Sequence, residues 1–240
     1  MYQHILFDLY GTLVDIHTNE QKPFLWQKLA LYLGLQGAAC TPQALRTFYR
    51  RAVAEAEETL RRQSPAGACP EIDIGAVFAA MYQTGGVTPT EQQVADAALV
   101  FRTLSLQKLR LFDGAADLLR TLRAAGKGVY LLSNAQALFT RPELQHLGLA
   151  PLFDGVLLSS QAGVKKPDPA FYHSLCRRYG LDPAACLMVG NDDEADCRGA
   201  QAAGMHSLYV QTEQSPPLTR PLPEGCTRIP CIAEAARYIL

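Results

Sequence analysis

Residues 4–15 read His-Ile-Leu-Phe-Asp-Leu-Tyr-Gly-Thr-Leu-Val-Asp, an apolar run that ends on the carboxylate of Asp8. Gly11 and Thr12 follow three and four residues later. The pattern predicts a buried strand with Asp8 at its carboxyl end, where ligands bind in open α/β sheets. An Asp in this position can also simply cap a turn. The rest of the chain decides between these two hypotheses.

The composition is typical of a soluble enzyme, with 48% hydrophobic and 19% charged residues among 240. A net charge of −1 and the lack of a basic run argue against nucleic acid and anionic membranes as partners. No apolar segment approaches the roughly 20 residues that span a bilayer, and the start lacks a signal-peptide pattern. We therefore expect a cytoplasmic protein. Its seven scattered cysteines, without a CxxC pair, are expected to remain reduced thiols.

Residues 16–110 have helical spacing of apolar residues and few β-branched runs, which predicts an all-helical insertion. Thr41-Pro42 is typical of a helix start, with an N-cap and Pro at the first helical position. Thr88 to Glu91 fits a capping box at the start of another helix. Trp26 to Leu33 and Ile74 to Tyr82 complete a prediction of four main helices.

From Asp113 onward, short apolar strands alternate with helices, which predicts βαβ units and a parallel sheet. Polar residues collect where successive strands end, and right-handed crossovers bring those ends to one edge of the sheet. The polar positions are Asp8, Ser133, Asn134, Lys166 and the run Asn191-Asp192-Asp193-Glu194 with Asp196. Each position alone has an ordinary explanation as a turn, a solvated Lys or an exposed helix start. Their joint order favours one functional site.

The four motifs resemble those of the haloacid dehalogenase-like hydrolase superfamily, in the same order and over nearly the whole chain. Asp8, Tyr10 and Thr12 fit the first motif, Asp-x-x-x-Thr, and Ser133 fits the second, a Ser or Thr at a strand end. Lys166-Pro167 fits the third. Gly190-Asn191 with Asp196 fits the fourth, an acidic loop.

The resemblance implies an α/β fold with a Rossmann-like parallel sheet core and an inserted all-helical cap domain. The core would comprise residues 1–15 and 111–240, and the cap residues 16–110. This arrangement is similar to subfamily I of the superfamily, with a helical C1-type cap. The resemblance also implies a small-molecule substrate and a monomer or homodimer.

The same resemblance assigns roles to individual residues. Asp8 would be the nucleophile that forms an aspartyl intermediate, with Tyr10 and Lys166 as further catalytic residues. Thr12, Ser133, Asn134 and Lys166 would bind the substrate by donating to its negative oxygens. The expected cofactor is Mg²⁺, a hard cation held by oxygen ligands. Its candidate ligand positions are Asp8, Tyr10, Asn191, Asp192 and Asp196.

Tyr10 departs from the phosphatase pattern, because phosphatases of the superfamily place an acid in that slot to protonate the leaving oxygen and activate water. A phenol with a pKa near ~10 suits that task poorly. Asp-x-Tyr-Gly-Thr, with Asp15-Ile16-His17-Thr18 after it, resembles the dehalogenase branch instead. A departing halide needs no proton.

The acidic fourth loop favours phosphate, because carboxylates gathered beside Asp8 would repel one another unless a cation were bound. The dehalogenase branch works without a metal and holds its substrate with an Arg in a Leu-Trp-Arg segment. Here the segment is Leu25-Trp26-Gln27. Asn191 stands where a direct acidic metal ligand is usual, and its amide oxygen is a weaker ligand.

The sequence therefore favours a Mg²⁺-dependent phosphatase of a small phosphorylated metabolite. A metal-free 2-haloacid dehalogenase is the alternative, and a catalytically weak binding or scaffold protein of the same fold is a third hypothesis. A dinucleotide site is disfavoured because no G-x-G-x-x-G follows the first strand. The insertion would set specificity, with generic candidates Trp26, Lys28, Tyr49 and Arg50 that equally fit core or surface positions.

Overall fold

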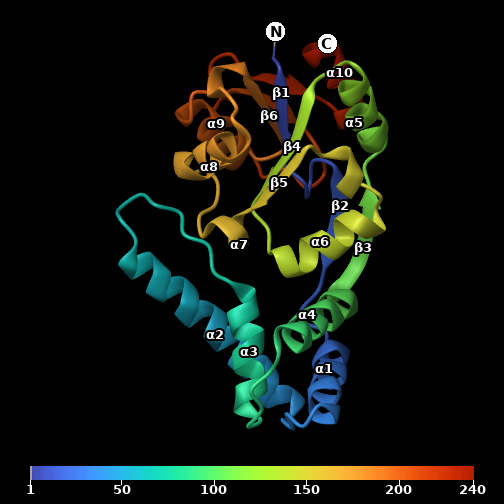
Figure 1. Ribbon diagram of the computed structural model, residues 1–240, viewed down its shortest axis with the longest axis vertical. Coiled ribbons are helices and arrows are strands. Elements are labelled where there is room, and N and C mark those ends of the chain that lie inside the picture. The colour runs from blue at the N-terminus through green and yellow to red at the C-terminus, as the bar shows by residue number, and fades with distance from the viewer. Residues whose placement is uncertain (1) are drawn as a thin grey trace.

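A computed structural model describes residues 2–240 as a sheet-containing core with a helical insertion at one end (Figure 1). Both termini lie at the end of the core that faces away from the insertion (Figure 1). None of the helices described in residues 2–240 is both long enough and apolar enough to cross a membrane.

The core is built on a six-stranded parallel sheet with strand order β5-β4-β1-β6-β7-β8. Its strands are β1 (His4–Phe7), β4 (Gly128–Ser133), β5 (Gly155–Leu158), β6 (Cys186–Gly190), β7 (His206–Val210) and β8 (Thr227–Ile229). Phe7 is in register with Leu131 on one side and Val189 on the other, so β1, β4 and β6 end close together. The predicted α/β fold with a Rossmann-like parallel sheet is confirmed.

Helices cover both faces of this sheet, because successive side chains of a strand point to opposite faces. Ile5 and Phe7 pack in one apolar cluster with α5 and α10, while Leu6 packs in another with α8 and α9. The helices of the core are α5 (Ala115–Ala124), α6 (Ala137–His146), α7 (Ser159–Ala162), α8 (Pro169–Tyr179), α9 (Gly199–Ala202) and α10 (Ala236–Ile239). Asp168 is the N-cap of α8, and its side chain accepts from Ala170 N–H.

The helical insertion contains α1 (Pro23–Leu35), α2 (Pro42–Gln63), α3 (Ile74–Thr84) and α4 (Glu91–Ser105). Its own core holds Trp26, Tyr49, Phe78 and Phe101, whose ring centroids lie 5.0 to 6.1 Å apart in successive pairs. Trp26 and Tyr49 are therefore structural residues of the insertion. Lys28 and Arg50 are exposed.

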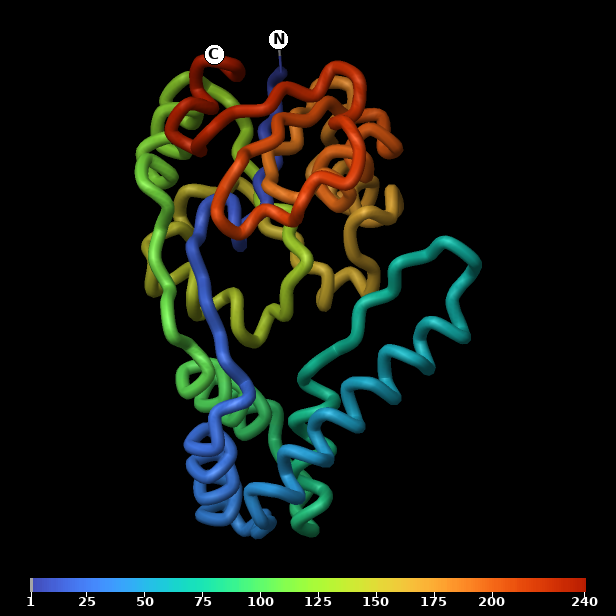
Figure 2. The backbone as a smooth tube through the Cα atoms, turned by 180° about the vertical axis from the view of Figure 1, so that it is seen from behind, coloured from blue at the N-terminus to red at the C-terminus, as the bar shows by residue number. Residues whose placement is uncertain are grey.

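An antiparallel ribbon of β2 (Val14–Thr18) and β3 (Leu106–Leu111) joins the insertion to the core, and Figure 2 shows its two segments side by side. Residues 16–110 were predicted to be all-helical, so this ribbon was not predicted, and neither was β8. The described chain ends with a 3₁₀ turn, Ile232–Glu234, followed by α10.

The capping box of α4 lies two residues later than predicted. Thr90, not Thr88, is the N-cap, and its hydroxyl accepts from Gln93 N–H while the Gln93 side chain accepts from Thr90 N–H. Both threonines precede an acidic or amide residue by three positions, so the sequence allows either box.

Substituting Thr90 should therefore destabilise the protein, whereas substituting exposed Thr88 should not. We expect Thr90→Ala to lower the free energy of unfolding by about 1 kcal/mol. Thr88→Ala should change it by less than about 0.5 kcal/mol. Urea unfolding of both variants measures the difference. Equal losses would contradict the assigned cap.

Candidate active site

Asp8 follows β1 directly, and its N–H donates to the Val189 carbonyl of β6 at 2.9 Å. The side chain is 11% exposed. The chain then turns at Gly11, whose φ of +82° suits glycine, and an added Cβ would lie 2.4 Å from Asn191 Nδ2. The turn therefore requires glycine both for its backbone conformation and for the close approach of Asn191.

Lys166 lies between two carboxylates. Its Nζ donates to Asp8 Oδ1 at 2.8 Å and to Asp196 Oδ1 at 2.6 Å, and the three side chains are almost fully buried. Although burial alone would lower it, the carboxylates of Asp196 and Asp8 raise the pKa of Lys166 above its usual value. Burial raises the pKa of Asp196, and the positive charge of Lys166 offsets part of that increase.

Three further side chains surround Asp8. The Ser133 hydroxyl donates to Asp8 Oδ1 at 3.0 Å, and the Thr12 hydroxyl lies 3.5 Å from Asp8 Oδ2 and 3.1 Å from Asn191 Oδ1. Asn134 acts through Lys166: its amide accepts from Lys166 N–H at 2.8 Å and donates to Lys166 O at 3.0 Å. These contacts fix the loops after β4 and β5 relative to each other.

The acidic residues after β6 do not all face Asp8. Asp196 is linked to Asp8 through Lys166, which donates to both carboxylates. Asp192 lines the cavity beside Asp8, and its Oδ1 accepts from the N–H groups of Glu194 and Ala195. Asp193 and Glu194 instead lie 3.6 Å from the guanidinium of Arg198. The charge around Asp8 is therefore lower than the sequence suggests, because arginine neutralises part of the run.

Tyr10 turns its hydroxyl toward α6. The phenol donates to Glu143 Oε2 and lies 3.0 Å from the Thr140 hydroxyl. Arg102 of α4 pairs with Glu143 at 2.6 Å and places its guanidinium over the Tyr10 ring, 5.7 Å from the centroid. Burial, together with the Glu143 charge, raises the pKa of Tyr10 well above its usual value. No sequence motif marks Arg102, Thr140 or Glu143, so their place beside Tyr10 was not predicted.

The site opens into a cavity of about 220 Å³. Its lining includes Asp8, Tyr10, Ser133, Asn134, Lys166, Asn191, Asp192 and Asp196, together with Gln214 and Pro216, which the sequence analysis did not single out. Gln214 Nε2 donates to Asp15 Oδ1 at 2.7 Å and to Ile16 O at 3.0 Å. It comes from the Pro-rich segment after β7, whose composition indicates only a surface loop.

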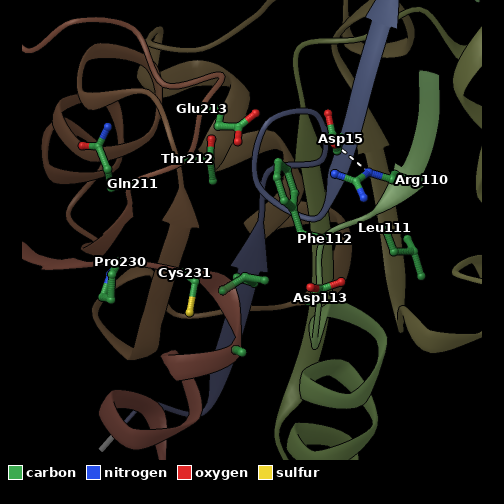
Figure 3. A pocket seen from close by; sticks show the side chains of 12 residues that line it. Asp15, Arg110, Leu111, Phe112, Asp113, Gln211, Thr212, Glu213, Pro230 and Cys231 are labelled. Atoms are coloured by element: carbon green, nitrogen blue, oxygen red, sulfur yellow. Dashed lines mark hydrogen bonds and ion pairs between the residues drawn. The ribbon is translucent and has the colours of Figure 1, made fainter. Parts of the chain in front are cut away.

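A larger cavity of about 430 Å³ lies where β3 meets the C-terminal segment (Figure 3). Asp15 and Arg110 line it and form an ion pair of 2.9 Å, marked by the dashed line in Figure 3. Asp8 and Lys166 do not line this cavity. Its connection to the cavity beside Asp8 is indirect: Asp15 lines the larger cavity and accepts a hydrogen bond from Gln214, which lines the smaller one.

Within residues 2–240, no three His, Cys, Asp or Glu side chains are grouped as a metal site. The oxygens near Asp8 nevertheless suit a hard cation, because the Asp8 carboxylate and the Asn191 amide oxygen both approach the Thr12 hydroxyl. Asp8 and Asn191, with Asp192 at the cavity wall, are the groups that would hold Mg²⁺.

A carboxylate at a strand end, held by a buried Lys and a Ser hydroxyl on an α/β sheet, defines a class of hydrolases that use an acid as nucleophile. The family of haloacid dehalogenase-like hydrolases matches residues 2–204, and the chain belongs to this family. The family predicted from the four motifs is thereby confirmed.

Curated relatives with a phosphatase name are similar to part of this chain. Phosphoserine phosphatase of Thermus thermophilus is 30% identical over 131 residues, which are 55% of this chain and 51% of that protein. The chain spans about half the length of the curated relatives it matches.

Two solved structures share the fold over nearly all of both chains. A phosphatase of the family from Thermococcus onnurineus has a TM-score of 0.62 and 17% identity, covering 99% of this chain and 97% of its own. The 2-haloacid dehalogenase from Pseudomonas syringae pv. Tomato DC3000 has a TM-score of 0.66 and 21% identity, covering 100% and 98%. At these identities the likeness shows the fold alone.

Removing the Lys166 charge should leave two buried carboxylates without a counter-ion. We expect Lys166→Met to lower the free energy of unfolding by about 3 to 5 kcal/mol at neutral pH. Adding Asp196→Asn should recover part of that loss, because it removes one of the two charges. Urea unfolding of the single and double variants checks both expectations. A loss below about 1 kcal/mol in Lys166→Met would contradict the ion-pair assignment.

Proposed function

We propose that this protein is a Mg²⁺-dependent phosphatase of a small phosphorylated metabolite, acting through an aspartyl-phosphate at Asp8. The observation that carries the proposal is the pairing of Asp8 with Lys166 and Ser133 at the wall of a small polar cavity. The similarity to phosphoserine phosphatase supports a phosphate ester over a 2-halo acid as the substrate.

In the first step, a carboxylate oxygen of Asp8 attacks phosphorus, and the leaving alkoxide departs. Asp8 Oδ1 is held by Lys166 and Ser133, whereas Oδ2 receives the longer 3.5 Å contact from Thr12 and keeps lone pairs for attack. Lys166 remains charged and lies beside the phosphoryl oxygens, whose negative charge it offsets. Bound Mg²⁺ would add positive charge there.

In the second step, water attacks the aspartyl-phosphate and regenerates Asp8. Splitting hydrolysis this way replaces one difficult displacement by two easier ones. Asn134 keeps the Lys166 loop in place through its paired hydrogen bonds of 2.8 and 3.0 Å. The same Lys166 can therefore serve both steps without rearrangement.

A metal-free 2-haloacid dehalogenase is the second candidate, favoured by Tyr10. Its hydroxyl is bound to Glu143 and Thr140, so it is not available to protonate a leaving alkoxide. Halide departs from carbon without a proton. The Lys166 ammonium, already between Asp8 and Asp196, would offset part of the negative charge of the site without a metal.

Hydrolysis of aryl and acyl phosphates with and without Mg²⁺ tests the leading proposal. We expect turnover that a chelator abolishes and that Asp8→Asn, a nearly isosteric variant, reduces at least about 1,000-fold because the nucleophile is lost. Activity unaffected by the chelator would contradict the metal-dependent phosphatase. Halide release from short 2-halo acids, assayed on the same preparation, would instead support the dehalogenase.

Placing an acid in the Tyr10 slot should accelerate phosphatase turnover of substrates with poor leaving groups. We expect kcat for alkyl phosphates to be about 10-fold or more higher in Tyr10→Asp than in Tyr10→Asn, because general acid catalysis typically contributes 10²- to 10⁴-fold. Tyr10→Asn is the matched control, since its amide has the same shape and no proton to transfer. Equal rates for the two variants, both folded by circular dichroism, would contradict the phosphatase account.

A further inference from the structure

Four side chains from three parts of the chain meet beside the catalytic cavity. Tyr10 comes from the loop of the nucleophile, Arg102 from the last turn of α4 in the helical insertion, and Thr140 and Glu143 from α6 in the core. Tyr10 donates to Glu143, and Arg102 Nε lies 2.6 Å from Glu143 Oε1. We call these four residues the Tyr10 cluster.

The Arg102–Glu143 ion pair in this cluster is largely shielded from water. The side chains of Arg102 and Glu143 are 13% and 6% exposed. The guanidinium also stacks over Phe139, 5.2 Å from the ring centroid. Because a buried charge without its partner is strongly unfavourable, Glu143 requires Arg102, and therefore α4, in this position.

The cluster is joined to the reacting carboxylate by a short and tightly packed piece of chain. Tyr10 is two residues from Asp8, and the next residue, Gly11, is fixed on both sides. Its N–H donates to Val14 O at 2.8 Å, and its carbonyl accepts from the Thr212 hydroxyl at 2.7 Å. With Asn191 also packed against Gly11, a shift of Tyr10 must be passed on to the loop that carries Asp8 and Thr12.

We propose that Arg102 and Glu143 are positioning residues that act through Tyr10, so that the geometry of the Asp8 loop depends on the placement of the helical insertion. This inference rests on the proposed function for its kinetic consequences. Its structural consequence, the ordering of the Asp8 loop by Arg102, does not. In this arrangement Tyr10 is a connector between the insertion and the nucleophile loop.

A second contact between the insertion and the core provides a matched control. The segment before α3 lies against the loop of Lys165: Lys165 N–H donates to Cys69 O at 2.8 Å, and Glu71 accepts from the Ser159 hydroxyl at 2.8 Å. Glu71 makes no hydrogen bond to Tyr10, Asp8 or Thr12 in the described residues. Glu71→Gln therefore weakens insertion–core contact without touching the Tyr10 cluster.

The kinetic test compares Arg102→Met, Tyr10→Phe, their double variant and Glu71→Gln on an aryl phosphate with Mg²⁺. Misplacement of a reacting group by about 1 Å can cost ~100-fold, so we expect Arg102→Met to lower kcat by about 10- to 100-fold with little change in KM. The double variant should be no slower than Arg102→Met, because both substitutions break the same path. Multiplied effects, or a kcat equal to that of Glu71→Gln, would overturn the proposal.

Hydrogen exchange of the backbone amides of residues 9–14 gives a readout that needs no activity. We expect faster exchange there in Arg102→Met than in the wild type and in Glu71→Gln, and an intermediate rate in Arg102→Lys, which keeps the charge but loses the planar fork. If Arg102→Met does not fold, Arg102→Lys and Glu143→Gln carry the comparison. Unchanged exchange at residues 9–14 would overturn the proposal whether or not the protein hydrolyses phosphates.

Discussion

The ammonium of Lys166, held between the carboxylates of Asp8 and Asp196, is the interaction on which the rest of the site depends. Like charges this close cannot both stay ionised in a buried place without a cation, and Lys166 supplies one from within the chain. The sheet makes this possible, because β1 and β6 are neighbours and end together, while the loop after β5 reaches across to them. The strand order therefore brings together the two carboxylates and the ammonium that pairs with them.

The Tyr10 cluster lies beside this group of charged side chains. In the slot where phosphatases of the family carry an acid, this chain has a phenol whose hydroxyl is bound to Glu143 of α6. The pKa of Tyr10 is raised by its burial and by the Glu143 charge, so the phenol stays protonated and serves as a hydrogen-bond donor. The residue that departs most from the phosphatase motif is therefore the one that contacts both the core and the helical insertion.

Sequence reasoning could find the fold and the strand-end residues, because the apolar run before Asp8 and the alternation after Asp113 are local signals. Periodicity indicated all four helices of the insertion, although the cap of α4 is Thr90 and not Thr88. Arg102 and Glu143 could not be found, since 41 residues separate them and only folding makes them partners. The sequence predicted that Glu194 lies near Asp8, because it does not reveal that Glu194 pairs with Arg198 instead.

The central claim is that Asp8, held by Lys166, becomes phosphorylated during turnover. Rapid acid quenching during hydrolysis of an acyl phosphate, followed by borohydride reduction and peptide mass spectrometry, tests it directly, because the reductant converts an aspartyl-phosphate to homoserine. The account predicts homoserine at residue 8 in the wild type and none in Asp8→Asn. Ongoing phosphate release with unmodified Asp8, or homoserine at another aspartate such as Asp192 or Asp196, would contradict it.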